Sequence, residues 1–560
     1  MTQLQKLFWE QQRRALSLND SRGMRWHPML IRLALHLHSL SDSAYSFLGE
    51  SEILVLPSKR RLYDYCHFIE PKEGCQEEFL HHIREKISKC GTEDHFSYVN
   101  VMLDEMHIRS GLVVKRSTGE LIGYTQLNDC EEELKRMQDD IDSKIYKPKL
   151  ATKVLVYLAN GVTSNVKDVV AVFSTDILSA SQLYERTWEV IYNLEDAGIK
   201  VLSITCDGAS VNRKFLLMNE SLEKKIKYTY YTKNLAAGSR PLFFILDPPH
   251  LLKTVRNALG NSFSHKRTRK LWKNNEYLSW KVIEELYKLT ERDKFRCHKL
   301  TKAHIKLTSF SCMTVLYATQ VLSNSVASSI EAIAGHEKMK MFQTSELIKF
   351  IRLMNRFFDC MNGKETSGEE ATYDRQEEEN RAQDEENEKT VHDKAPYTKL
   401  DDPRFDFLHN DFLSYFSEWK NDIDSRPGLF SDNEKNRMII SHQSLGALET
   451  TVHGVAGAIR FMIAAGAPSV NARVFNQDPL EQYFGKVRRA QGDNRNPSLK
   501  TFQDVRLNLH AQGLVASSSQ KGNTEVQKRK GIIEIDSSDL PVMKSSRKEE
   551  KSVALNLLPF

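Results

Sequence analysis

The chain has 560 residues, of which 40% are hydrophobic and 9% aromatic, and this length predicts roughly two to four domains with their own cores. The net charge of +5 is small, but basic clusters alternate with an acidic run at 365–388, so a polyanion would meet local basic surface. No apolar run approaches the ~20 residues of a membrane span, the N-terminus lacks a signal-peptide core, and the eight cysteines have no zinc-finger spacing. These features exclude a membrane protein and favour a soluble intracellular chain with reduced thiols.

The first predicted elements are helical. Residues 1–23 predict an amphipathic helix that could serve dimerisation, because apolar side chains recur at helical spacing, at Leu4, Leu7, Phe8 and Leu16. Residues 24–92 predict a helix-turn-helix DNA-binding domain with helices over 28–40, over 44–48 and from 57 onward. The third helix presents basic residues in its first turn, as a recognition helix does: Lys59, Arg60 and Arg61. A small helical bundle with a solvated basic face fits this pattern equally well.

From residue 96 the apolar residues change from a helical to a strand-like period, and 96–255 predict the first part of an α/β domain. Strands are predicted in "SYVNVMLDEMHI", "KVLVYLAN" and "DVVAVFS", and a helix over 180–197 is followed by Gly198, as expected of a C′ glycine. Two further buried strands, "KVLSITC" and "PLFFIL", stop at Asp207 and Asp247.

The remaining chain is predicted to be mainly helical. Residues 256–440 form an all-α insertion, interrupted at 363–396 by an acidic stretch that predicts a disordered loop. Helical sequence resumes over 441–515, the second part of the α/β domain, and 516–560 predict a disordered tail.

Three acidic residues stand where the predicted elements would bury them. Asp104 lies within an apolar strand, Asp207 ends another, and Glu481 lies in the first turn of a later helix. A buried carboxylate is costly unless it is paired, hydrogen-bonded or bound to metal. Two such aspartates on neighbouring strands, with an acid from a helix packed across the sheet, suit two Mg²⁺ ions about 4 Å apart for phosphodiester chemistry.

Each acid also has a structural interpretation. Asp104 could stand in water on an edge strand, and Asp207 could form an Asx turn before a helix. Glu481 could complete a capping box at N3, with Asp478 as the N-cap and Pro479 at N1.

Five motifs occur along the chain in this order: "LDEMHIRSGLVV", "LSITCDGASVN", "FFILDPPHLLKTVRNAL", "MNRFFDCMNG" and "DPLEQYFGKVRRAQGDNRNPS". Together they resemble the P-element transposase family and its THAP-domain relatives, and the similarity spans about 24–510. The resemblance implies an RNase H-like catalytic domain split by a GTP-binding helical insertion and preceded by a helix-turn-helix domain. The family's N-terminal zinc module has no counterpart before Cys66, so the chain is a fragment or diverged copy, or the helix-turn-helix alone carries DNA specificity.

The resemblance also assigns roles to residues. It implies that Asp104, Asp207 and Glu481 are catalytic and hold the two Mg²⁺ ions, with Asp247, His250 and Asp478 as supports. For His250 a structural role at a helix start is favoured over proton transfer. It further implies a GTP site outside any P-loop, formed by Asn355, Phe358, Asp359, Lys302 and Ser325. The alternative there is a core ring at Phe358 and a surface charge at Asp359.

The function that follows is a Mg²⁺-dependent cut-and-paste DNA transposase with GTP as a non-hydrolysed cofactor, working on double-stranded DNA in the nucleus as a homo-oligomer. Arg488 and Arg489 would meet DNA phosphates, unless they only complement the helix dipole. The alternative function is a domesticated, non-cleaving DNA-binding protein that retains the transposase fold.

Overall fold

The computed structural model describes residues 2–18, 24–51, 53–66, 69–114, 119, 121–125, 137–138, 149–220, 227–238, 240–263, 268–293, 296–363, 392–490 and 496–512. The predicted tail at 516–560 and most of the predicted acidic loop lie outside these residues. Among the described helices, none has the length and apolar character that crossing a lipid bilayer requires.

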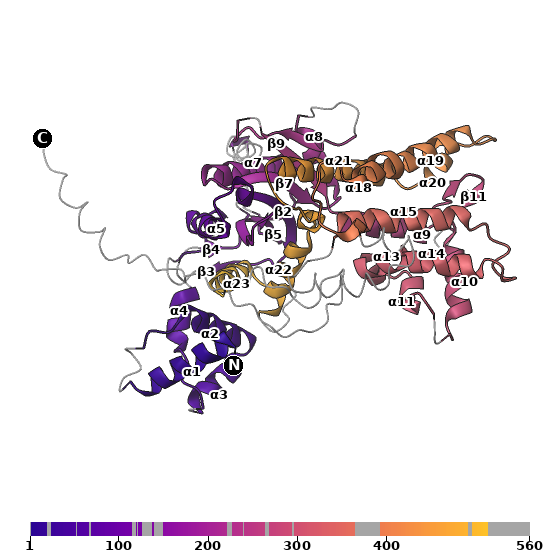
Figure 1. Cartoon of the computed structure of the whole chain (residues 1–560). Coiled ribbons are helices and arrows are strands. Elements are labelled where there is room, and N and C mark those ends of the chain that lie inside the picture. The colour runs from indigo at the N-terminus through magenta and orange to yellow at the C-terminus, as the bar shows by residue number, and fades with distance from the viewer. Residues whose placement is uncertain are drawn as a thin grey trace, which may run out of the picture.

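Four helices form the N-terminal region: α1 (Gln3–Leu16), α2 (Pro28–Leu40), α3 (Asp42–Glu50) and α4 (Lys59–Cys66). The predicted helix over 28–40 is confirmed, with Pro28 at its first position. The amide of Gln12 in α1 both donates to and accepts from the Val55 backbone, each at 2.9 Å, so α1 packs within its own chain. The Cys66 thiol at the end of α4 donates to Asn508 of α23 (Leu499–Ala511), which joins this region to the rest of the molecule (Figure 1).

A seven-stranded mixed sheet forms the centre of the molecule, in the order β1-β6-β5-β2-β7-β9-β8. Its strands are β1 (Gly74–Cys75), β2 (Tyr98–His107), β5 (Lys153–Gly161), β6 (Lys167–Thr175), β7 (Lys200–Cys206), β8 (Tyr231–Lys233) and β9 (Pro241–Leu246), and β3 (Val113–Val114) pairs with β4 (Leu121–Ile122) beside it. β2 runs antiparallel to β5 and parallel to β7, and β7 runs parallel to β9. The carboxyl ends of β2, β7 and β9 therefore share one edge of the sheet.

Helices cover both faces of this sheet. Side chains of β2 alternate between the faces, so Leu103 joins the core with α7 (Ala180–Asp196), while Met102 packs with α22 (Asp478–Arg489) and α23. The other helical elements of this domain are α5 (Glu77–Cys90), η2 (Asp94–Ser97), α8 (Ser210–Met218), α9 (Pro248–Gly260), α21 (His442–Ala464) and η4 (Ala472–Phe475). Gly454 lets α21 approach β9 closely, because a Cβ there would collide with the Phe244 carbonyl oxygen.

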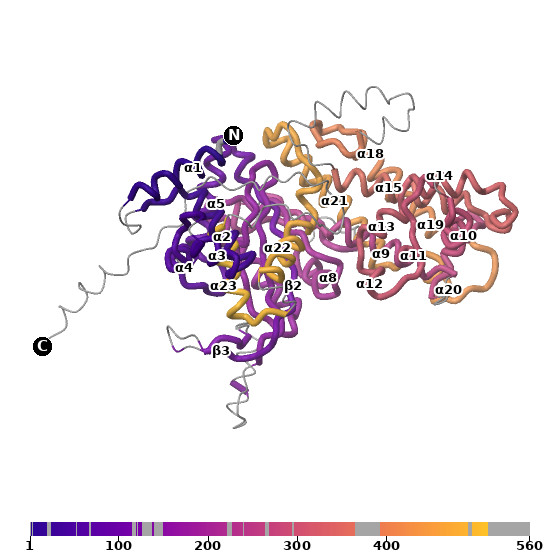
Figure 2. The backbone as a smooth tube through the Cα atoms, turned by 90° about the horizontal axis from the view of Figure 1, so that it is seen from below, coloured from indigo at the N-terminus to yellow at the C-terminus, as the bar shows by residue number. Residues whose placement is uncertain are grey.

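The insertion lies to one side of the sheet, away from the N-terminal helices (Figures 1 and 2). Its helices are α10 (Trp280–Thr290), α11 (Lys302–Ile305), α12 (Ser309–Met313), α13 (Val315–Val321), α14 (Asn324–Ile333), α15 (Ser345–Met361), α18 (Pro403–Asp406), the π-helix η3 (Phe407–Phe412), α19 (Leu413–Ser425) and α20 (Asp432–Arg437). The all-α prediction needs a correction, since β10 (Trp272–Lys273) and β11 (Glu276–Tyr277) pair as a short antiparallel ladder.

The prediction of a disordered loop over 363–396 is too long at its C-terminal end. Residues 364–391 lie outside the described part of the chain, but 392–394 are helical and Asp393 is buried. Charged side chains from this turn pair with α15, which offsets its lack of large apolar residues.

Candidate functional site

Three aspartates form a row at the carboxyl ends of β2, β7 and β9. Met102 of β2 is paired with Thr205 of β7, so Asp104 and Asp207, each two residues further on, are level with one another. Cys206 is paired with Leu246 of β9, so Asp207 is in turn level with Asp247. Neighbouring strands are about 4.8 Å apart. Because β2 is a central strand, the edge-strand alternative for Asp104 is wrong.

The Asx-turn interpretation of Asp207 is confirmed, and it is compatible with a place in the row. Its Oδ1 accepts from the Ala209 amide at 2.8 Å and from the Asn212 side chain at 2.6 Å. This turn leads into α8 and fixes the carboxylate at the end of β7.

A buried asparagine fastens the segment before α22 to the sheet. Asn100 of β2 donates to the Val474 carbonyl at 3.0 Å, and its Oδ1 accepts from Ser203 at 2.8 Å and Thr205 at 2.9 Å. Asn160 of β5 donates to the same carbonyl at 3.0 Å. The sequence interpretation missed Asn100, although an amide within an apolar strand was a visible signal.

Gln477 determines where α22 begins. Its backbone N–H donates to Asp247 Oδ1 and its side chain donates to the Leu103 carbonyl, both at 2.7 Å. These bonds connect the helix start to the residue before Asp104 and to the end of β9. The sequence interpretation also missed this glutamine.

The predicted capping box at Asp478 and Glu481 is wrong. Gln477 is the N-cap, its carbonyl accepts from the Glu481 amide at 3.1 Å, and the Asp478 amide donates to Asn476 at 3.2 Å. Asp478 is buried, with a carboxylate oxygen 3.4 Å from the Arg473 guanidinium. The Glu481 carboxylate is therefore not used to cap its own helix.

Glu481 is instead connected to the row through His250. Asp247 caps α9, accepting from the His250 amide at 2.9 Å, and the same oxygen lies 2.7 Å from His250 Nδ1. His250 Nε2 lies 3.5 Å from Glu481 Oε1. Burial lowers the pKa of His250, but the hydrogen bond and charge of Asp247 outweigh it and the pKa is about 9. His250 thus has the predicted structural place at a helix start and also contacts the third acid.

The acids of the row interact electrostatically. Burial, and after it the charge of Asp207, raises the pKa of Asp104 to about 7, with a smaller rise from Glu481. Lys253, one turn after His250, has a pKa that burial lowers, and four acids oppose this shift: Glu481, Asp247, Asp207 and Asp104. Lys253 is a further residue of the site that the sequence interpretation missed.

These carboxylates fit a divalent metal by donor type and charge. Mg²⁺ prefers carboxylate oxygens, and a cation would offset the burial and repulsion that raise the pKa of Asp104. Within the described ranges no three Asp, Glu, His or Cys side chains are already close enough together to hold an ion. Binding would therefore require side-chain rotation at Asp104, Asp207 and Glu481.

We expect Asp104→Asn to stabilise the metal-free protein at pH 8. The pKa of Asp104 is about 7 when folded, against 3.8 for an ordinary aspartate, so folding loses stability as pH rises between these values. The substitution removes this loss, with an expected gain on the order of 2–4 kcal/mol at pH 8 and almost none at pH 4. Urea unfolding in EDTA at both pH values measures this difference in unfolding free energy. Equal urea midpoints for wild type and Asp104→Asn at pH 8 would contradict the interpretation of Asp104 as a strained acid.

The residues assigned to GTP gather partly on α15. Asp359 is only 9% exposed, so the surface-charge alternative is wrong, and its Oδ2 accepts from Asn355 at 2.8 Å. Asn355 Oδ1 accepts from the Asn324 amide at 3.2 Å, beside Ser325 at the start of α14.

The other two assigned residues lie differently. The Phe358 ring packs, partly buried, against the main core, as the structural alternative has it. Lys302 is exposed at the start of α11, and among the described residues no hydrogen bond or ion pair connects it to α15.

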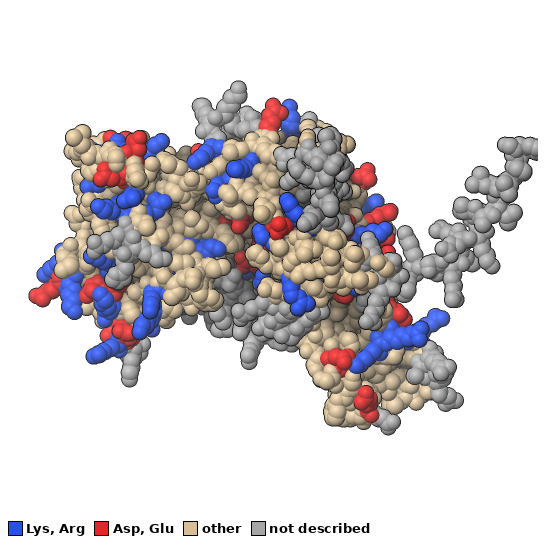
Figure 3. All heavy atoms as spheres, turned by 180° about the vertical axis from the view of Figure 1, so that it is seen from behind, with Lys and Arg blue, Asp and Glu red and all other residues tan. Residues whose placement is uncertain are grey.

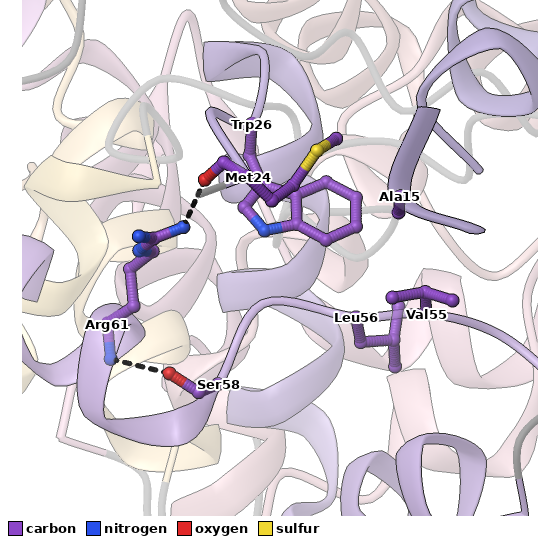
Figure 4. Close-up of a pocket in the computed structure, with 7 residues that line it drawn as sticks. All are labelled: Ala15, Met24, Trp26, Val55, Leu56, Ser58 and Arg61. Atoms are coloured by element: carbon purple, nitrogen blue, oxygen red, sulfur yellow. Dashed lines mark hydrogen bonds between the residues drawn. The ribbon is translucent and has the colours of Figure 1, made fainter. Parts of the chain in front are cut away.

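The three basic residues of α4 have different surroundings. Lys59 and Arg60 are exposed, and Lys59 forms an exposed ion pair with Asp42 at 2.6 Å. Arg61 donates to the Met24 carbonyl at 2.6 Å and lines a cavity of about 330 Å³ between α1 and α4 (Figure 4). Arg61 is thus part of the helical packing, whereas Lys59 and Arg60 remain accessible.

Basic residues also gather at the end of α22. Arg489 is exposed, Arg488 is partly buried, and the Arg489 guanidinium donates to the Gly485 carbonyl at 3.1 Å. Burial, then the charges of Arg489 and Lys167, lower the pKa of Lys486 to about 8. Cations from β6 and α22 therefore lie close enough here to repel one another, which makes this a positively charged surface.

Three family models match this chain in succession. They describe a TNP-like RNase H N-terminal domain over 71–218, a TNP-like GTP-binding insertion domain over 249–374, and a TNP-like RNase H C-terminal domain over 474–505. Together they match more than half of the chain. The chain thus has an RNase H-like domain split by an insertion of the GTP-binding type.

Two curated relatives and one solved structure agree with these models. The Drosophila melanogaster transposable element P transposase is 23% identical over 507 residues, 89% of this chain and 56% of its own length. Human DNA transposase THAP9 is 22% identical over 339 residues, 60% of this chain and 35% of its own length. The Drosophila P element transposase strand transfer complex has a TM-score of 0.64 at 20% identity, covering 92% of this chain and 98% of that one, which supports the fold. The chain spans only about a third to a half of the relatives' lengths.

Proposed function

This chain belongs to the family of P-element-type transposases, and we propose that it is itself a cut-and-paste DNA transposase that cleaves phosphodiesters at transposon ends and transfers the freed strand. The observation that carries this proposal is the row of Asp104, Asp207 and Asp247, which Glu481 approaches through His250. Asp104, Asp207 and Glu481 would hold two Mg²⁺ ions, which when bound activate the attacking hydroxyl and stabilise the leaving oxygen.

The chain's own residues prepare this site. Asn100 and Gln477 fasten the start of α22 to the sheet, so Glu481 projects toward the strand ends. Asp247 fixes the orientation of the His250 ring, whose second nitrogen faces Glu481. Acidic side chains lie in a recess between the insertion and the sheet domain, with basic side chains at its border (Figure 3), a charge pattern suited to DNA around a metal site.

Cleavage of supercoiled plasmid tests the proposal. We expect the purified chain to nick it with Mg²⁺ or Mn²⁺ and not with EDTA. A domesticated, non-cleaving DNA-binding protein is the second candidate, and it would bind the plasmid without nicking it. The raised pKa of Asp104, caused by burial and Asp207, argues against that candidate, because acids that repel one another have no use in a site without cations.

The proposal includes the other family features. GTP would bind the insertion as a non-hydrolysed cofactor, with Asp359 and Asn355 facing the base. Action in the nucleus would follow from a chromosomal DNA substrate, and assembly as a homo-oligomer from the need to hold two transposon ends.

We propose that Lys59 and Arg60 contact DNA phosphates. Replacing both by Gln should weaken double-stranded DNA binding and reduce the slope of log K against log salt by about 0.9 per lost contact. Fluorescence anisotropy across a salt series measures this. Arg61→Gln is the matched comparison, because its side chain holds the Met24 carbonyl and its loss should reduce thermal stability instead. An unchanged salt slope in the double variant would exclude α4 as a DNA contact.

A further inference from the structure

The turn that follows the acidic insert is fixed to the insertion domain by one buried arginine. Arg404 is 1% exposed, and its guanidinium donates to the carbonyls of Asp393 and Pro396, each at 3.3 Å, and of Ala395. Its remaining donors bind the Asp402 carboxylate, at 2.7 and 2.8 Å. A rigid guanidinium fork that binds three carbonyl oxygens within residues 393–396 fixes the path of that segment.

Two more contacts fix this turn against α15. Asp393 pairs with Arg356 of α15 at 2.9 Å, and the Tyr397 hydroxyl donates to the Cys360 carbonyl at 3.0 Å. Lys394 lies between these two anchors. Its backbone position beside the C-terminal part of α15 is therefore set by the fold.

Lys394 directs its ammonium to the buried acid of α15. The Lys394 Nζ lies 3.5 Å from Asp359 Oδ1, while Asn355 Nδ2 donates to Oδ2 at 2.8 Å. Burial raises the pKa of Asp359 to about 6, and the charge of Lys394 opposes this rise. Each carboxylate oxygen has two lone pairs, so both oxygens can accept a further hydrogen bond.

The order of these groups matches one edge of guanine. Read across the site, they are a donor at Lys394, an acceptor at Oδ1 and an acceptor at Oδ2 of Asp359. Guanine presents, in the same order, the O6 acceptor, the N1–H donor and the N2 amino donor. Adenine presents an amino donor followed by a ring acceptor. Its amino group would therefore face the donor of Lys394, and its ring nitrogen would face an acceptor oxygen of Asp359.

We propose that Lys394 is a specificity-determining residue that donates to guanine O6 while Asp359 accepts from N1–H and the N2 amino group. The inference rests on the proposed binding of GTP to this insertion. It adds to that site a residue from beyond the acidic insert, outside the part of the chain that matches the GTP-binding family model.

Nucleotide competition on the full chain tests this assignment. Labelled GTP would be displaced by GTP, ATP, 6-thio-GTP or ITP, because 6-thio-GTP changes only the acceptor at position 6 and ITP lacks only the N2 amino group. The wild type should bind 6-thio-GTP and ITP about tenfold more weakly than GTP, and ATP more weakly still. Lys394→Met should bind GTP about tenfold more weakly and no longer distinguish GTP from 6-thio-GTP, while it still disfavours ITP.

Two further variants separate specificity from folding. Lys394→Arg keeps a donor and should recover part of the discrimination at position 6, and Lys399→Met removes an exposed cation five residues away and should behave as wild type. A wild type that does not bind GTP would overturn the nucleotide site and this assignment together. GTP binding with the same preference for GTP over 6-thio-GTP in wild type and Lys394→Met would overturn the assignment of Lys394 alone.

Discussion

Asp104→Asn and Glu481→Gln should each reduce Mg²⁺-dependent plasmid cleavage by more than about 10³-fold, equivalent to about 4 kcal/mol of transition-state stabilisation. Both substitutions keep the size of the side chain and remove a charge that divalent cations require. Both variants should remain folded and bind DNA, because Gln477 fixes the start of α22 and backbone pairing holds β2 in the sheet. Single-turnover nicking with Mg²⁺, beside DNA binding in Ca²⁺, measures the two properties separately.

Glu105→Gln is the matched control for this prediction. Glu105 is the neighbour of Asp104 on β2, but it points to the other face, where it pairs with Lys153 and accepts from Thr175, both at 2.9 Å. Its cleavage rate should stay within a few-fold of wild type. If Asp104→Asn cleaved as fast as Glu105→Gln, the row of aspartates would not be the catalytic site.

The strand ends that carry the acids could be predicted because their signal is local. Apolar runs that stop at Asp207 and Asp247 indicate buried strands with an acid at the end, and the structure places both residues there. Asp104 could be singled out because an acid within an apolar strand is costly unless it is paired, hydrogen-bonded or bound to metal, whereas its catalytic role is implied by the family resemblance. The strand register that brings Asp104, Asp207 and Asp247 level with one another could not be predicted from the sequence, since it depends on pairing between strands that are far apart in the chain.

The residues that the sequence interpretation missed act over long distances or against local preference. Asn100 and Val474 are 374 positions apart, so no spacing rule connects them. Local preference favoured Asp478 as the N-cap, but the bonds of Gln477 to Asp247 and Leu103 override it. Lys394 lies in a stretch whose acidic composition predicted a disordered loop, but Arg404, Arg356 and Tyr397 fix this turn from outside it.

Asn100→Leu should be the most damaging substitution outside the acids. The Val474 carbonyl would lose one of its two side-chain donors, and the buried Ser203 hydroxyl would lose its acceptor. A lost hydrogen bond and one unsatisfied buried group together cost about 2–4 kcal/mol of unfolding free energy. The start of α22 would also be less well fixed, and loss of such supporting contacts reduces activity about 10–100-fold.

Asn160→Leu distinguishes positioning from simple loss of polarity. Asn160 donates to the same Val474 carbonyl at 3.0 Å, but its own Oδ1 is buried with no hydrogen-bond partner among the described residues. Replacing it removes one hydrogen bond, which lowers the unfolding free energy, and one unsatisfied buried oxygen, which raises it. The two effects on stability should roughly cancel. We therefore expect urea unfolding to show a loss about 2 kcal/mol larger for Asn100→Leu, and nicking assays to show near-normal cleavage only for Asn160→Leu. Equal losses in the two variants would mean that Asn100 contributes general packing, because of these two asparagines only Asn100 also accepts from Ser203 and Thr205 of β7.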